Sequence, residues 1–184
     1  MSPTSPILDM GPAEIVWKYG ESDAAYLGKT LGGIHVTMET NAADILEDQN
    51  GDAPVNAVFT GSVFTLEVNL TRLSVAELRR VMLAEAVAGK PCVVPIENQV
   101  GCDLYDLAKA LVIKPLCGNV VSTDPCEWTL IHKAYPLVGL DLTWDKDTQR
   151  IFPVKFKVFV SQESGESGEF GTIGMDSAST ALGI

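Results

Sequence analysis

Residues 64–70 read Phe-Thr-Leu-Glu-Val-Asn-Leu, which is the clearest alternating run in the chain. Successive side chains of a strand point to opposite faces of a sheet. The apolar positions of this run would therefore cover a core. Three polar side chains would line the opposite face: Thr65, Glu67 and Asn69. The pattern predicts a half-buried strand whose polar face meets water or another polar surface.

A helix is predicted directly after this strand. Ser74-Val75-Ala76-Glu77 is a capping box, in which the serine hydroxyl accepts a hydrogen bond from an orphan amide and the glutamate reaches back. Apolar residues then follow with helical spacing: Val75, Leu78, Met82 and Ala86. Gly89 and Pro91 are expected to end the helix, whose apolar stripe must pack on a sheet.

The remaining elements are predicted to be mostly strands. Extended segments are expected at residues 15–19, 34–39, 111–115, 128–133, 137–144 and 151–160. A short helical turn is expected within residues 103–110. Residues 40–56 are rich in Asn, Asp, Gly and Pro, which predicts turns and a loop. The expected fold class is all-β, that is, mainly β with one flanking α-helix.

The composition along the chain predicts three parts. Residues 1–12 contain three prolines and little periodicity, and we interpret them as a flexible N-terminal arm. Residues 13–160 form the β domain. Gly, Ser and Glu dominate residues 161–184, which predicts a flexible C-terminal tail.

The charge of the chain is acidic. Lys and Arg number 13 and Asp and Glu 24, so the formal net charge is −11. Such a balance argues against a protein that binds nucleic acid phosphates, although a polyanion can move along a surface of like charge without adhering. The N-terminus has no basic patch followed by an apolar run, and no stretch approaches the ~18 apolar residues of a membrane span. We expect a soluble protein made in a cytoplasm, with reduced thiols.

The sequence does not support a zinc site, a calcium loop or an acid–base couple. Four cysteines and two histidines contain no C-x-x-C pair, so isolated small hydrophobic residues explain the cysteines better than zinc does. A calcium loop around Gly51 fails because Leu46 and Ala57 stand where carboxylates are required. Asp141 and Asp145 are better interpreted as solvated acids than as an acid–base couple. The sequence therefore predicts no enzyme, no catalytic residue, no cofactor and no metal site.

Four groups of segments follow one another along the chain: LGGIHV at 31–36, DQNGDAPV at 48–55 followed by Gly61 and the 64–70 strand, GCDL at 101–104 with its apolar continuation to Pro115, and IHKAYP at 131–136 coupled to RIFPVKF at 150–156. In this order they resemble the tail tube, or major tail, proteins of long-tailed bacteriophages. Together they cover roughly residues 13–160. The resemblance implies a β-sandwich or barrel flanked by a helix. It also implies hexameric rings that stack into a tube, to which each subunit lends long strands.

The resemblance implies a structural virion protein. Its partners would be further copies of itself and other tail proteins, namely the tape measure, the terminator and the baseplate or tip. Genomic DNA would pass through the channel without specific binding, and no membrane would be involved. The protein would be located in the virion tail after assembly in the bacterial cytoplasm.

Two groups of site residues are predicted. The loop at 40–57 would reach toward a neighbouring ring through Asp48, Asn50, Gly51 and Pro54. A simple hairpin connection is the alternative. Thr65, Glu67 and Asn69 are candidates for the lumen, where Glu67 and neighbouring acids would keep DNA from adhering. The alternative for Glu67 is an ordinary solvent-facing strand residue.

Other protein classes remain as alternatives. A tail terminator, a distal tail protein or a decoration protein would form single rings or capsid spikes. A tube subunit of a bacterial secretion or contractile injection system is a second alternative. A free-standing β-sandwich that binds carbohydrate is a third, but only 7% of the residues are aromatic.

Overall fold

The computed structural model describes residues 11–48, 52–71, 73–85, 87–96, 100–118, 120–139, 151–163 and 168–175. Two helices lie in these parts of the chain, α1 (Val75–Val81) and α2 (Leu104–Leu107). The strands are β1 (Ala13–Trp17), β2 (Ala25–Tyr26), β3 (Lys29–Ile45), β4 (Asn56–Thr71), β5 (Lys109–Cys117), β6 (Val120–Val121), β7 (Thr129–Val138), β8 (Phe152–Phe159) and β9 (Gly171–Ile173).

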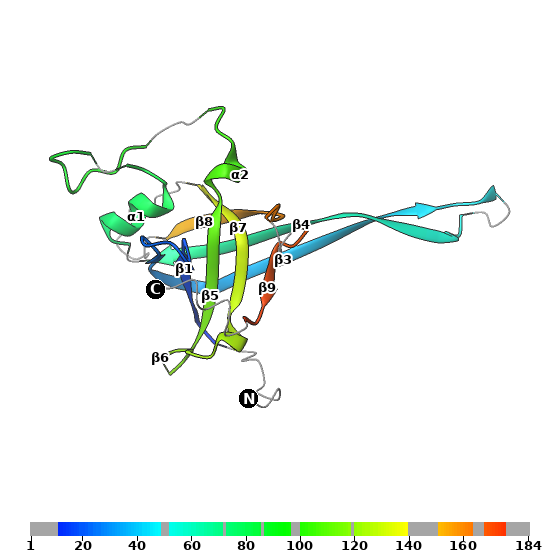
Figure 1. The fold of residues 1–184 in the computed structure, drawn as a ribbon, viewed down its shortest axis with the longest axis horizontal. Helices are drawn as coiled ribbons and strands as arrows, with labels where there is room; N and C mark the ends of the chain where they lie inside the picture. The colour runs from blue at the N-terminus through cyan, green and yellow to red at the C-terminus, as the bar shows by residue number, and fades with distance from the viewer. Residues whose placement is uncertain are drawn as a thin grey trace.

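The nine strands of the described residues form one antiparallel sheet with the order β2-β1-β5-β7-β8-β4-β3 (Figure 1). β6 pairs with β5, and β9 pairs with β7 beside this path. The predicted class is thus confirmed as mainly β with a flanking helix. The sheet is open and compatible with a β-sandwich.

The sheet curls around one apolar core. Trp17 on β1 and Phe156 on β8 are separated by two strands of the sheet, yet their ring centroids lie 5.5 Å apart. The buried cluster includes residues of five strands and one helix: Ile15, Trp17, Leu66, Val68, Leu70, Val81, Leu111, Ile131, Ala134, Val154, Phe156 and Val158. Val81 belongs to α1, so this helix covers part of the core as its apolar side predicted.

Several predictions from the sequence are confirmed in detail. Leu66, Val68 and Leu70 of β4 are buried, whereas Asn69 on the opposite face is exposed. The capping box is complete, because the Glu77 N–H donates to the Ser74 side chain and the Ser74 N–H donates to the Glu77 carboxylate. The helix is shorter than predicted, since it ends at Val81 with Met82 as its C-cap.

The predicted loop at residues 40–56 is strand at residues 40–45 and at residue 56. β3 continues to Ile45 and β4 begins at Asn56, because cross-strand hydrogen bonding outweighs the turn preference of Asn41 and Asp44. Residues 128–133 and 137–144 were predicted as two strands, but β7 runs without a break to Val138. Residues 140–144 lie outside the described part of the chain.

The prediction of a flexible tail at residues 161–184 is wrong for the segment around β9. β8 pairs with β7 only from Lys133 to Val138, and β9 pairs with residues 129–131 of the same strand. Gly171 permits this contact, since a Cβ there would lie 2.1 Å from the Leu130 carbonyl oxygen. The glycines that suggested flexibility thus include one that serves close backbone approach. Residues 1–10 and 176–184 lie outside the described part.

We expect Gly171→Ala to displace β9 and to lower the free energy of unfolding by about 1–3 kcal/mol, as overpacking does elsewhere. Urea denaturation and amide hydrogen exchange at residues 129–131 measure both effects. Gly139→Ala is the matched control, because nothing lies within 4 Å of its added Cβ. Equal stabilities of the two variants would contradict the close approach.

Candidate assembly site on the β3–β4 hairpin

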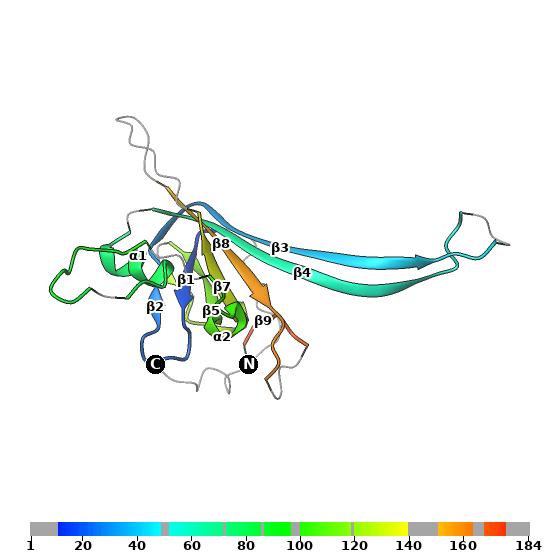
Figure 2. The same cartoon turned by 90° about the horizontal axis from the view of Figure 1, so that it is seen from above.

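The β3–β4 hairpin extends far beyond the rest of the sheet (Figures 1 and 2). The two strands pair from Lys29 with Thr71 to Ile45 with Asn56. β8 covers β4 only along its residues 65–70. From Asn56 to Thr65 the chain spans roughly 30 Å at the rise of an extended strand. Within the described residues, this outer part is a two-stranded ribbon without a third strand.

The ribbon is bent by a β-bulge. Asn41 pairs with Gly61, but the next residue, Ala42, pairs with Phe59, so Thr60 has no partner on β3. Gly61 has φ +137°, which favours glycine. Bulges increase the local twist and bend a strand. The curved course of the hairpin in Figure 2 agrees with this local irregularity.

Both faces of the ribbon expose apolar side chains. Residues that pair across two strands share a face, so Met38, opposite Phe64, and Phe59, opposite Ala42, lie on the face that continues from the core. Their side chains are 57% and 64% exposed. Val58 and Val63 are exposed on the other face. Apolar surface of this extent is typical of contacts with another protein chain.

The edges of the ribbon are unprotected. In the described part of the chain no strand pairs with the outer edge of β3, and none pairs with β4 between Asn56 and Phe64. Natural edge strands usually carry Lys, Pro or other features that prevent pairing. Neither Lys nor Pro occurs at residues 30–45 or 56–64. These backbone groups are available to a strand of another molecule.

Two grooves flank the base of the ribbon. One, of about 440 Å³, lies between the ribbon and β9 and is lined by Val36, Met38, Phe170 and Ile173 among others. Phe170 stacks on Phe64 with a centroid distance of 5.7 Å. The second groove differs from the first because lysines line it. Both are open to solvent beside unpaired strand edges.

The second groove, of about 460 Å³, lies where β4 and β8 diverge. It is lined by residues of β4, β7 and β8, by Phe170 and by Val160, which follows β8. Two lysines, Lys155 and Lys157, lie at this groove and are exposed. We call it the lysine groove.

The predicted lumen residues lie together on the sheet face opposite the core. Thr65 pairs with Lys157, Glu67 with Lys155 and Asn69 with Pro153. Lys155 forms an ion pair with Glu67, and this hydrogen bond holds the pKa of the Glu67 carboxyl below its usual value. We expected acids around Glu67. The residue opposite it on β8 is Lys155 instead, because strand pairing over long sequence separation decides which residues are neighbours.

Two of the four predicted stacking residues lie at the far end of the hairpin. Asp48 and Pro54 are exposed there, whereas Asn50 and Gly51 lie outside the described part of the chain. The two predicted groups are thus separated by the length of the ribbon. Lys155 and Lys157 were not among the predicted site residues, although they alternate along β8 with the apolar residues Val154, Phe156 and Val158.

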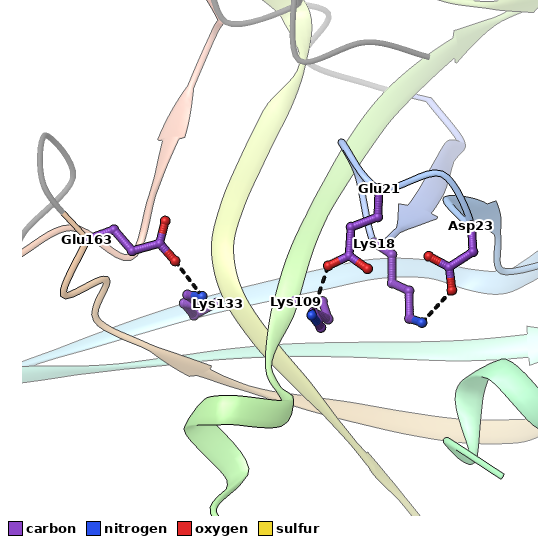
Figure 3. Close-up of polar contacts among 6 residues, drawn as sticks. All are labelled: Lys18, Glu21, Asp23, Lys109, Lys133 and Glu163. Carbon is purple, nitrogen blue, oxygen red and sulfur yellow. Dashed lines mark hydrogen bonds and ion pairs between the residues drawn. The ribbon is translucent and has the colours of Figure 1, made fainter. Parts of the chain in front are cut away.

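Several charged residues on the body form ion pairs with one another. Figure 3 shows Lys133 with Glu163, Lys109 with Glu21 and Lys18 with Asp23, at nitrogen–oxygen distances of 2.7, 2.9 and 2.5 Å. The lysine side chains hold the pKa of the Asp23 and Glu163 carboxyls below their usual values through hydrogen bonds. These pairs are exposed, so they contribute little to stability.

Among the described residues, no three His, Cys, Asp or Glu side chains are grouped to hold a metal ion. Cys92 and Cys102 are exposed free thiols. No helix in the described part is long and apolar enough to cross a membrane. No protein-family model and no curated protein sequence matches the chain.

We expect the double substitution Met38→Ser and Phe59→Ser to reduce self-association without lowering thermal stability. Both side chains are exposed on the ribbon, and exposed substitutions usually change stability by about 0.5 kcal/mol or less. Sedimentation velocity and thermal denaturation measure the two quantities. Leu66→Ser, at a buried position of the same strand, is the contrasting control and should destabilise the fold.

Proposed function

We propose that this protein is a structural subunit of a bacteriophage tail tube, which forms stacked hexameric rings around a channel for genome delivery. The observation that carries the proposal is the β3–β4 ribbon, with its exposed apolar faces and unpaired edges. A lone two-stranded hairpin is marginally stable in water. The ribbon gains hydrogen bonds and buried area only when another chain covers it.

A contact between the ribbon of one molecule and the body of a neighbour would be heterologous. The ribbon projects from one end of the molecule, and α1 lies at the opposite end (Figure 2). When one surface binds a different surface of an identical neighbour, the repeat closes into a ring or continues as a filament. Strand pairing between neighbours also removes exposed edges, as closure of a barrel does. Stacked rings combine these two outcomes.

The charge of the protein suits a channel for DNA. The net charge is −11, and residues 30–71 contain no Lys. A like-charged wall lets a polyanion pass without adhering. We retain Thr65, Glu67 and Asn69 as candidates for the lumen, with Lys155 making that face mixed in charge. The tape measure, terminator and baseplate or tip proteins of a tail would be the further partners.

Negative-stain microscopy of the purified full chain tests the proposal directly. Long stacks of rings are the expected result. Single rings or spikes would instead favour a terminator, distal tail or decoration protein. A monomer at every concentration would overturn the proposal and favour a free-standing binding module.

Deletion of residues 48–54 should leave a folded subunit that no longer polymerises. Ile45 and Asn56, which flank the deleted segment, end β3 and β4 away from the core, so the body should fold. Circular dichroism checks folding, and sedimentation velocity measures polymer size. Unchanged polymer length would reduce the segment to a hairpin connection.

A further inference from the structure

The outer hairpin is acidic throughout. Five carboxylates lie between residues 38 and 63, and this stretch contains no Lys or Arg: Glu39, Asp44, Glu47, Asp48 and Asp52. Apolar side chains are exposed beside them at Ile45, Leu46 and Val55. The end of the hairpin therefore offers a mixed acidic and apolar surface.

The lysine groove has the complementary character. Lys155 and Lys157 are exposed there, beside the partly exposed apolar side chains of Leu137 and Val160. The Lys155 side chain pairs with Glu67 but is 66% exposed, so exchange for another carboxylate costs little. Among the described residues, no carboxylate pairs with Lys157.

The two surfaces of one molecule cannot meet. The lysine groove begins where Thr65 pairs with Lys157, and the hairpin end lies roughly 30 Å along the ribbon from that point. Cross-strand pairing holds the ribbon extended over this distance. Contact between them requires a second copy of the chain.

We propose that the acidic end of the hairpin of one subunit docks into the lysine groove of a second copy. This inference rests on the proposed function and assigns the surface that receives the hairpin. Thr65 and Glu67 also line the lysine groove, so a docked hairpin would cover them and would leave Asn69 alone of the three as a candidate for the lumen. Each copy then donates one hairpin end and accepts another, and the contact repeats along the assembly. Opposite charges at the contact also guide its alignment and suppress wrong pairings.

Charge reversal on each side tests the docking. The hairpin variant is Asp44→Lys with Asp48→Lys, and the groove variant is Lys155→Glu with Lys157→Glu. Each should raise the protein concentration needed for polymerisation about tenfold or more, because like charges then face each other. The variant with all four substitutions should polymerise again near the wild-type concentration. Sedimentation velocity and negative-stain microscopy measure assembly.

Two further variants guard against indirect effects. Lys157→Glu alone leaves the Glu67–Lys155 pair intact and should still weaken assembly. Glu85→Lys with Asp106→Lys changes the net charge as much as the hairpin variant does, but on exposed residues of the body. This control should polymerise like the wild type. Raising the salt concentration from about 0.05 M to 0.5 M should weaken the assembly of the wild type and of this control by the same amount.

The outcomes separate this inference from the proposed function. Ring stacks that form normally despite reversal on either side, or that respond equally to the body control, would overturn the docking and leave the tube proposal standing. Single reversals that weaken assembly without recovery in the combined variant would also overturn the pairing of these two surfaces. A wild-type chain that never assembles would overturn both.

Discussion

The structure depends on one constraint, the need of backbone N–H and C=O groups for hydrogen-bond partners. On the body, each long strand except the edge strand β3 has a neighbour on both sides over part of its length. Beyond Thr65, β8 no longer covers β4, and the β3–β4 ladder continues with one neighbour for each strand. The molecule is thereby divided into a body, whose inner strands pair on both sides, and a ribbon, whose two strands each leave one edge of backbone hydrogen-bonding groups unpaired. The ribbon stays in register because its base is part of the core, where Leu66, Val68 and Leu70 are buried.

The same division explains how much of the fold the sequence could predict. Period-two alternation arises when one face of a strand is buried, as at residues 64–70 and 152–158, and both strands were predicted there. The outer ribbon exposes both faces, so residues 40–45 have no such pattern and their turn-forming Asn and Asp suggested a loop. β9 was missed for a related reason. It has only three residues, and its glycine serves a close backbone contact that composition cannot distinguish from flexibility.

The sequence predicted the site residues on β4 but not the residues of β8 that lie beside them. Alternation placed Thr65, Glu67 and Asn69 on the polar face, which the structure confirms, but it did not identify what lies beside them. The Glu67–Lys155 pair joins residues 88 positions apart, and no local pattern specifies that register. Sequence thus indicated which way side chains point, whereas the order of strands decided that lysines rather than acids adjoin Glu67.

The acids of the ribbon also bear on which contacts between copies are disfavoured. Two unprotected β3 edges could pair with each other, and this symmetric contact would end assembly at a dimer. It would also bring two sets of carboxylates together along the ribbon, with no Lys or Arg between residues 30 and 71 to offset them. Like charges placed opposite each other destabilise strand pairs. Lysines are found instead on the body of the molecule, so the charge distribution opposes ribbon-to-ribbon pairing and favours ribbon-to-body contact. An unprotected edge can then be kept for a heterologous partner, because charge rather than Pro or Lys on the edge itself prevents the symmetric alternative.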